Sequence, residues 1–420
     1  MNRIARAALM TAFAAAMLLA GASTALAATP LVTASTPFAR FSPDRDGYRD
    51  SLSITYRLRA SARTSVRVYR DGALVRTLRA AATAGAGTRT LRWDGRTGAG
   101  VAAPVGAYRW VVTARRGTRT VTVRGSVTLE RRTLPADRWV GFYVPGVPQS
   151  TAPLTGLEAT SGVRAEVLNY FQNTVEGFTA GAAANAIAEG KVPLITLEFW
   201  DPAEGVDQPA YSLKAISGGA WDDYLHRYAR DAKAFGSTVW LRPLHEMNGD
   251  WYPWAGTAAG NVPADFVPAW RHIHDVFVEE GALNVMFVWC PSSDSVPNTA
   301  ANSFGTYWPG EAYVDYMALD GYNFGSSASW STWRSFADTF GTAYARVAAL
   351  SAKPMFIAET GSSTMGGDKS AWIAEMFRVI PERFPRLQGV VWFDVNKECD
   401  WRIESSAGAL SSFRVGAAAF

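Results

Sequence analysis

Two glutamates in the second half of the chain each follow a short apolar run. Glu246 lies in the stretch RPLHEMNGDWYPW, and Glu359 lies in FIAETGSS. A protonated carboxyl group can pass a proton to a leaving oxygen, while an ionised carboxylate can attack the anomeric carbon of a sugar. Two such groups about 5 Å apart cleave a glycosidic bond with retention of configuration. Glu246 and Glu359 are therefore the first candidates for such a pair.

The runs before these glutamates belong to a repeated pattern of apolar segments. We expect strands near residues 139–144, 166–171, 192–199, 238–245, 284–290, 314–320, 354–359 and 389–394. Helical patterns such as 221–234 and 264–280 separate them, which predicts an α/β fold, a (β/α)8 TIM barrel, for residues 139–420. Barrel enzymes work at the carboxyl ends of their strands. Because the fourth and seventh strands lie across the mouth from one another, both glutamates are expected to face one cleft.

These motifs resemble glycoside hydrolase family 26, a retaining family with β-mannanases and β-glucanases, over roughly residues 136–415. The resemblance implies that Glu246 is the acid/base proton donor and that Glu359 is the nucleophile. It also implies that His245, next to the acid/base, orients the sugar and that glutamate. A packed, non-catalytic histidine is the alternative for His245.

The resemblance also assigns aromatic residues to the cleft. Trp251 is expected near the scissile sugar, and Tyr322, in Asp320-Gly321-Tyr322, is expected close to the nucleophile. A tyrosine hydroxyl that donates to Glu359 would keep that carboxylate ionised before attack.

Three further side chains are expected to bind substrate. Trp392, in VVWFD on the eighth strand, matches the floor of the minus-one subsite, and Trp200 and Asn248 are the other two. A tryptophan suits this role because its rigid, apolar ring face fits the C–H face of a pyranose.

The substrate has several candidates. Mannan-cutting members of the family commonly carry a histidine near the end of strand three, where this chain has Leu197-Glu198-Phe199-Trp200-Asp201-Pro202. The resemblance implies an endo-acting enzyme on β-1,4-mannan or glucomannan, with mixed-linkage β-1,3-1,4-glucan or β-1,3-xylan as alternatives. A sugar-binding barrel without catalysis is a remote alternative, because a protein that only binds is expected to have lost one of the two glutamates.

We expect no metal and no cofactor. His272 and His274 lie two positions apart in a helical stretch, so they point to different faces and suit no metal site. His245-Glu246 lacks the second histidine of a zinc-protease motif.

Residues 28–131 have a different pattern, in which apolar and polar residues alternate. Leu52, Ile54, Tyr56 and Leu58 share one face of a predicted strand, and Asp71-Gly72 is a turn signal. Several short strands with Gly-rich turns predict an all-β immunoglobulin-like sandwich, an accessory domain. The stretches FSPDRDG, VRVY and LRWDG resemble the flagellar-hook-cap type of bacterial immunoglobulin-like module. The aspartates of residues 44–50 suit a turn better than a calcium loop, which needs a further acid before its glycine and a final glutamate.

The charge of the chain is divided between these two parts. Residues 28–133 carry 20 arginines, no lysine and six acids, whereas residues 134–420 carry 19 basic and 31 acidic residues. An acidic barrel is a poor partner for nucleic acid and is consistent with a neutral polysaccharide. The basic face of the sandwich is expected to be solvated or to make weak contact with anionic cell-wall polymers. We expect a monomer.

Residues 1–27 have the pattern of a signal peptide. Arg3 and Arg6 precede an apolar run, and Ala25-Leu26-Ala27 is a small-x-small cleavage site. No other segment approaches about 20 continuous apolar residues, so we expect a secreted, extracellular protein with no membrane segment after cleavage. Residues 132–138 are expected to link the domains.

Export also makes a disulfide between the two cysteines conceivable. Cys290 and Cys399 lie far apart in the sequence, so the geometry of the fold decides whether they can pair.

Overall fold

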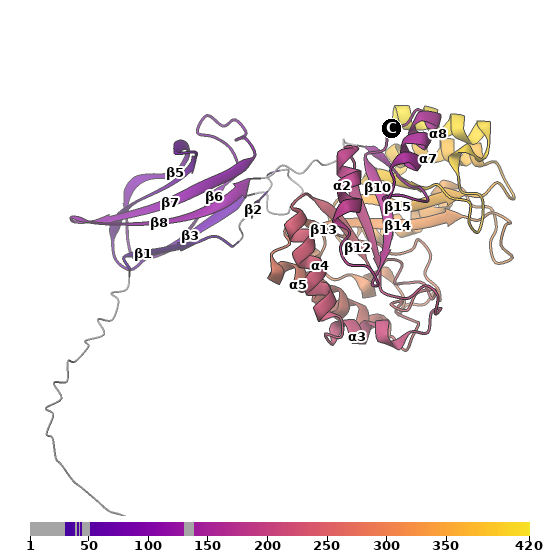
Figure 1. The fold of residues 1–420 in the computed structure, drawn as a ribbon, viewed down its shortest axis with the longest axis horizontal. Helices are drawn as coiled ribbons and strands as arrows, with labels where there is room; N and C mark the ends of the chain where they lie inside the picture. Colours follow the sequence, from indigo (N-terminus) through magenta and orange to yellow (C-terminus); the bar gives the residue numbers. More distant parts are fainter. Residues whose placement is uncertain (1–29, 38–39, 42, 44–50, 130–137) are drawn as a thin grey trace, which may run out of the picture. The chain divides into compact units, whose positions relative to one another are not determined.

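The computed structural model of the chain describes residues 30–37, 40–41, 43, 51–129 and 138–420. The predicted signal peptide 1–27, the acidic stretch 44–50 and residues 132–137 of the predicted link lie outside the described residues. The described chain contains a β-sandwich and a barrel (Figure 1).

The sandwich consists of two sheets of β-strands. One sheet has the order β1-β3-β6, and the other has the order β2-β8-β7-β4-β5. The strands are β1 (Val32–Ser35), β2 (Arg40–Phe41), β3 (Leu52–Leu58), β4 (Ala62–Arg70), β5 (Ala73–Ala84), β6 (Gly87–Trp93), β7 (Gly106–Arg116) and β8 (Arg119–Leu129).

The predicted alternation of side chains sets the core of the sandwich. Leu52, Ile54, Tyr56 and Leu58 of β3 are buried, and the residues between them are half-buried or exposed. The Asp71-Gly72 turn between β4 and β5 has φ angles of 48° and 83°, the left-handed region that hairpin turns require. The prediction of an immunoglobulin-like sandwich is confirmed.

The barrel is closed by parallel strands in the order β10-β11-β12-β13-β14-β15-β16-β9. The strands are β9 (Trp139–Tyr143), β10 (Val167–Asn173), β11 (Val192–Glu198), β12 (Val239–Pro243), β13 (Val285–Trp289), β14 (Tyr316–Asn323), β15 (Met355–Ser362) and β16 (Leu387–Phe393). Each predicted strand is present, with ends that differ by a few residues, and the predicted TIM barrel is confirmed.

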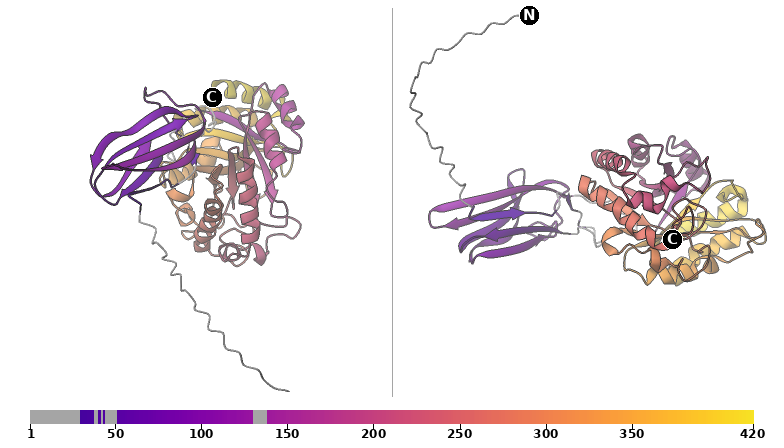
Figure 2. Two further views of the ribbon diagram at one scale, coloured as in Figure 1. Left: turned by 60° about the vertical axis from the view of Figure 1, so that its left-hand side comes forward. Right: turned by 90° about the horizontal axis from the view of Figure 1, so that it is seen from below.

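Helices surround the strands (Figure 2). They are α1 (Ala152–Ser161), α2 (Ala180–Ala188), α3 (Leu213–Ser217), α4 (Asp222–Phe235), α5 (Phe266–Glu280), α6 (Phe336–Ala348), α7 (Lys369–Arg383) and α8 (Ala407–Ala419).

The strands of the barrel are buried on both faces. Trp139, Trp240, Tyr316 and Phe356 fill the interior, with the Trp240 and Tyr316 rings 4.4 Å apart. The side chains at the alternate positions of each strand point outward and pack against the helices. Arg242 lies two positions after Trp240 on β12 and therefore points to the same interior, one layer nearer the carboxyl end.

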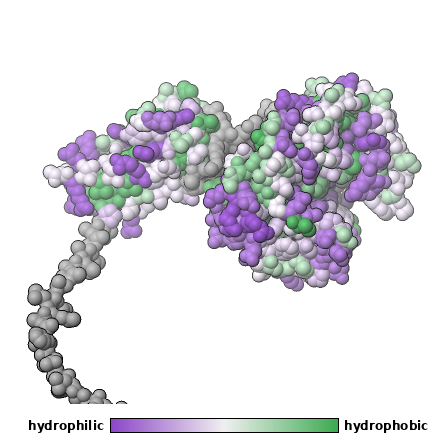
Figure 3. All heavy atoms as spheres, viewed as in Figure 1, coloured by the Kyte–Doolittle hydropathy of each residue, from purple (hydrophilic) through white to green (hydrophobic). Residues whose placement is uncertain are grey.

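No helix in the described part of the chain has both the length and the apolar character needed to cross a membrane. On the face seen in Figure 3, hydrophobic residues of the barrel form small separate patches among hydrophilic ones. Cys290 and Cys399 are both free thiols, so the conceivable disulfide between them is absent.

Candidate active site

Glu246 lies on the loop that follows β12, at the carboxyl end of the barrel. Leu244 and Glu246 have φ angles of 50° and 52°, a left-handed conformation that costs a non-glycine residue about 1–3 kcal/mol. The backbone N–H of Glu246 donates to the carbonyl oxygen of Cys290 at 2.8 Å. The protein therefore holds Glu246 in a conformation that its own backbone does not prefer.

The carboxyl group of Glu246 is suited to carry a proton near neutral pH. Burial and the negative charge of Glu359 raise its pKa to about 7, against the opposing effect of a hydrogen bond from Trp251. Trp251 Nε1 donates to Glu246 Oε2 at 2.7 Å. This environment keeps Glu246 largely protonated below neutral pH, as a proton donor requires.

Glu359, on β15, has a different environment. Its Oε2 accepts a hydrogen bond from the Tyr322 hydroxyl at 2.6 Å, and its Oε1 accepts one from Arg242 Nη2. The residue is 6% exposed. Two donors directed at one carboxylate orient both of its oxygens, and a nucleophile needs such a fixed direction.

Arg242 connects this carboxylate to a second one. Its Nη1 donates to both oxygens of Asp320 at 2.8 and 2.6 Å, and its Nε and Nη2 donate to Thr196 Oγ1 at 3.0 and 2.7 Å. Asp320 pairs with Glu359 in the register of β14 and β15. Burial raises the pKa of Asp320, and the Arg242 charge opposes that effect. One fully buried guanidinium thus pairs with two buried carboxyl groups.

His245 is buried among aromatic rings beside the two glutamates. Its Nε2 lies 3.2 Å from the Tyr252 hydroxyl, and its ring centroid lies 4.8 Å from that of Tyr252. Its Nδ1 has no hydrogen-bond partner in the part of the chain that the structure describes. Burial and the Arg242 charge hold its pKa well below the ordinary value, so the ring is neutral and can donate or accept a hydrogen bond.

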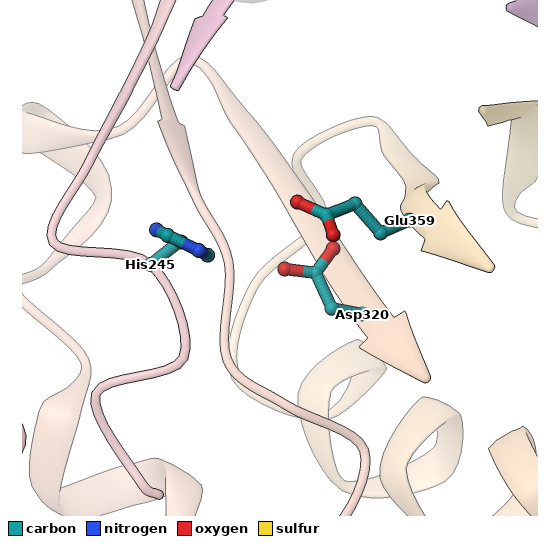
Figure 4. A group of neighbouring side chains, drawn as sticks. All are labelled: His245, Asp320 and Glu359. Carbon is teal, nitrogen blue, oxygen red and sulfur yellow. The ribbon is translucent and has the colours of Figure 1, made fainter. Parts of the chain in front are cut away.

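His245, Asp320 and Glu359 offer ligand atoms within 4.8 Å of one another (Figure 4). Such a group could be taken for a metal site. However, the guanidinium of Arg242 hydrogen-bonds to both carboxylates, so a divalent cation at this place would meet a positive charge. The arrangement fits a pair of carboxyl groups held by one arginine better than a metal centre.

A third carboxyl group, Glu198 at the end of β11, was not predicted as a site residue. It is 9% exposed, and its Oε2 accepts a hydrogen bond from Trp200 Nε1 at 3.1 Å. Burial raises its pKa to about 7, and the charge of Glu359 adds to that shift. Trp200 itself lies against Tyr252, with ring centroids 5.3 Å apart. Trp200 therefore contacts the ring that lies next to His245, and Glu198 accompanies it; the role of Trp200 in binding substrate stays a prediction.

Two of the predicted substrate contacts are in the wrong place. Trp392 is 0% exposed and packs against Trp372 of α7 and Phe413 of α8, on the helix side of β16. Asn248 is also fully buried, and its amide is used within the protein: its nitrogen donates to Ser292 O at 2.9 Å, and its oxygen accepts from Ser292 N at 2.8 Å. Neither side chain can contact a sugar in this conformation.

Other aromatic residues occupy the position expected for Trp392. Phe393, the next residue on β16, stacks on Tyr143 with centroids 4.7 Å apart and lies 5.7 Å from Tyr322. Trp401, after β16, has its ring 5.0 Å from that of Tyr322. These rings line the region around Glu359 from the β16 side. The VVWFD motif contains Phe393 but gives no sign of which of its aromatic residues faces inward.

Arg242 was also missed, although it lies in the same motif as Glu246. The signal was available: a charged residue inside an otherwise apolar strand must have buried partners. The site as a whole combines a carboxyl group that is protonated near neutral pH with a hydrogen-bonded carboxylate, and aromatic rings surround both. It can perform acid-assisted nucleophilic substitution at a sugar carbon.

Two stretches of the chain match models of known protein families. Residues 222–364 match the model of Glycosyl hydrolase family 26, and residues 44–118 match that of the FlgD Ig-like domain. The first match includes Glu246, Tyr322 and Glu359.

Curated relatives match part of this chain. Endoglucanase H of Acetivibrio thermocellus is 38% identical over 280 residues, which cover 66% of this chain and 30% of that protein. Mannan endo-1,4-beta-mannosidase A and B of Caldalkalibacillus mannanilyticus is 30% identical over 211 residues, covering 48% of this chain and 36% of that protein. The chain thus spans about a third of the length of each relative.

A solved structure supports the fold. An endo-beta-1,4-mannanase double mutant of Cellulomonas fimi is similar with a TM-score of 0.50 and 18% identity, over 67% of this chain and 71% of that one. At this identity the likeness concerns the fold alone. The family models give matches to stretches of the chain: residues 222–364 are similar to Glycosyl hydrolase family 26, and residues 44–118 are similar to the FlgD Ig-like domain.

Proposed function

We propose that the barrel is a retaining endo-β-glycanase that works by double displacement. The observation that carries this proposal is the contrast between two carboxyl groups of one site. Glu246 has a pKa raised to about 7, whereas Glu359 receives hydrogen bonds from Tyr322 and Arg242. A carboxyl group that carries a proton near neutral pH, beside a second one that two donors hold in place, suits this chemistry.

In the first step, an oxygen of Glu359 attacks the anomeric carbon, and the bond from that carbon to the leaving sugar oxygen breaks. Glu246 gives its proton to that oxygen, so the released chain leaves as an alcohol. In the second step, Glu246, now ionised, takes a proton from water. The water oxygen attacks the anomeric carbon, and the bond to Glu359 breaks, which restores both groups with net retention.

Neighbouring residues hold these two groups in place. Trp251 donates to one oxygen of Glu246 and fixes the direction of its carboxyl group. Tyr322 and Arg242 do the same for Glu359. Such fixed donors lower the cost of reorganisation during the reaction.

For the substrate, we propose a β-1,4-linked plant polysaccharide, with mannan or glucomannan as one candidate. Mixed-linkage β-1,3-1,4-glucan is a second candidate, and the 38% identity to a protein named Endoglucanase H supports a glucan as substrate. Sugars that differ at one hydroxyl group are distinguished by a few polar contacts, and Glu198 is a buried acceptor available for such a contact.

The test is to incubate the purified protein with galactomannan, glucomannan, barley β-glucan and β-1,3-xylan and to follow reducing ends. We expect rapid loss of viscosity on a mannan or on barley β-glucan, because an endo enzyme cuts within the chain. No release of reducing ends from any of the four would refute the proposal.

We also propose that residues 1–27 direct secretion. N-terminal sequencing of protein from the culture medium is expected to begin at Ala28. Retention of residues 1–27 on the exported protein would contradict cleavage at this site.

A further inference from the structure

Trp330 is the single exposed aromatic residue in the described part of the chain. It is 74% exposed and lies on the loop between β14 and α6. The fold itself does not need a large apolar ring at this place, because most of the ring contacts solvent. Tryptophan rings are among the side chains that contribute most to binding when a ligand covers them.

A path of ring contacts leads from Trp330 to the nucleophile. The centroids of Trp330 and Phe324 lie 4.8 Å apart, and those of Phe324 and Tyr322 lie 6.1 Å apart. The Tyr322 hydroxyl donates to Glu359 at 2.6 Å. Trp401 joins the path, with its ring 4.9 Å from that of Phe324. The exposed ring is therefore continuous with the catalytic site.

The loop that carries Trp330 is fastened at both ends by one side chain. Asn323 Oδ1 accepts hydrogen bonds from the backbone N–H groups of Gly325 at 3.2 Å and Arg334 at 3.1 Å. Asn323 is 1% exposed. Such a closed loop presents Trp330 in a fixed position, which reduces the entropy lost when a ligand binds.

A second loop supports the first from the side. The backbone N–H of Ser326 donates to the carbonyl oxygen of Met365 at 3.0 Å. Gly325 has a φ of 56°, and a Cβ atom there would lie 1.9 Å from the same oxygen. The close approach of the two loops therefore requires glycine at this position.

We propose that Trp330 forms a distal sugar-binding subsite, in which a pyranose ring of the polysaccharide chain stacks on the exposed indole. Phe324 meets the indole edge to face, with an interplanar angle of 61°. A neutral β-linked glycan fits this surface, because its sugar rings have apolar C–H faces. This inference rests on the proposed function, since the chain bound here continues from the one held at Glu359.

The subsite contributes to the binding of long substrates and not to the binding of short ones. A polysaccharide reaches both Glu359 and Trp330, whereas a short aryl glycoside bound at the scissile position does not extend to Trp330. Stacking on one aromatic ring changes affinity by about three- to tenfold. We therefore expect the ratio of kcat/KM on polysaccharide to kcat/KM on aryl glycoside to fall three- to tenfold in Trp330→Ala, mainly through KM.

The experiment compares Trp330→Ala and Trp330→Phe with Val415→Ala, which removes an exposed apolar side chain of α8 that is 67% exposed. Trp330→Phe is expected to restore part of the ratio, and Val415→Ala is expected to match the unaltered protein. An unchanged ratio in Trp330→Ala would overturn the proposal. An equal loss on both substrates would overturn it too, because it would place Trp330 at the scissile sugar.

Binding measurements separate this proposal from the catalytic one. Glu359→Ala, with and without Trp330→Ala, is run by affinity electrophoresis through gels that contain glucomannan or barley β-glucan. Weaker retardation of the double variant supports the subsite even if no hydrolysis is found with the unaltered protein, a result that would refute only the proposed function. Equal retardation of the two variants would overturn the subsite while leaving hydrolysis untouched.

Discussion

The arginines of the sandwich and the arginine of the barrel site carry the same charge in opposite surroundings. Arg67 on β4 and Arg109 on β7 are exposed, and neither side chain has a hydrogen bond or ion pair within the described residues. Arg242 is fully buried and donates to Asp320, Glu359 and Thr196. Water stabilises the first two charges, whereas the protein alone must stabilise the third.

This difference shows why the overall charge of the chain says little about its chemistry. The 20 arginines of residues 28–133 make that part strongly basic, and they follow from strand alternation, which puts polar residues on the solvent face. One buried arginine in the barrel positions the proposed nucleophile. Contact of the basic face with anionic polymers stays a prediction.

The largest expected effect comes from removing the buried charge. Arg242→Met is expected to destabilise the protein by about 3–5 kcal/mol, because Asp320 and Glu359 would be left buried without their partner. Hydrolysis is expected to fall by at least about 100-fold, since the Glu359 carboxylate loses an orienting donor. Thermal unfolding and kcat/KM measure the two effects.

The matched control is Arg67→Met, which makes the same chemical change at an exposed site. An equal loss of unfolding free energy in both variants would contradict the claim that burial makes Arg242 more important for stability than the exposed Arg67.

The pH dependence of hydrolysis tests the surroundings of Glu246. Because burial and Glu359 raise the pKa of Glu246 to about 7, Glu246 carries its proton below that pH and loses it above. We expect kcat/KM on polysaccharide to fall as the pH rises through about 7. A dinitrophenyl glycoside, whose leaving group needs no proton, is expected to lack this alkaline decline in its first step. The same decline with both substrates would contradict the role of Glu246 as proton donor.

A smaller effect is expected at Glu198, the buried third carboxyl group. Its pKa is raised from 4.5 to about 7, so the folded protein binds a proton more tightly than the unfolded chain does. Ionising Glu198 therefore costs stability as the pH rises from about 4.5 through 7. Because Glu198→Gln cannot ionise, its thermal midpoint is expected to exceed that of the unaltered protein at pH 8 and to approach it at pH 5. Glu204→Gln, at an exposed position, is the control, and a pH-independent difference for Glu198→Gln would contradict burial as the cause.

The smallest effect is expected on the sandwich face. Replacing Arg67 and Arg109 with glutamine is expected to change the free energy of unfolding by less than about 0.5 kcal/mol each. Hydrolysis of soluble polysaccharide is expected to be unchanged, because neither residue belongs to the barrel. A large loss of activity in the double variant would mean that the sandwich takes part in the site.

The sequence was sufficient for the elements and for the place of the two glutamates in the barrel, while their catalytic roles stay predictions. Strand alternation predicts the faces of β3 correctly, because one face of that strand is solvated and the pattern reports it. The positions of Glu246 and Glu359 follow from the rule that barrel sites lie at the carboxyl ends of strands.

The same reasoning fails for Trp392 and Asn248 because the relevant strand and loop give no such pattern. After the exposed Gln388, every residue of β16 is buried and apolar or glycine, so the sequence does not say whether Trp392 or Phe393 faces inward. Asn248 lies on a loop that is held by hydrogen bonds between its side chain and the backbone of Ser292. The two residues lie 44 positions apart in the sequence. Contacts of this kind are decided by the folded structure.

The central claim, that Glu359 forms a covalent bond to the sugar, has one direct test. The protein is incubated with a 2-deoxy-2-fluoro glycoside of the sugar that it hydrolyses, which slows release of the covalent intermediate, and is then digested and examined by mass spectrometry. We predict one labelled peptide with the sugar on Glu359, and no label in Glu359→Gln. A label on another residue, or release of product with inverted configuration from the natural substrate, would contradict the account.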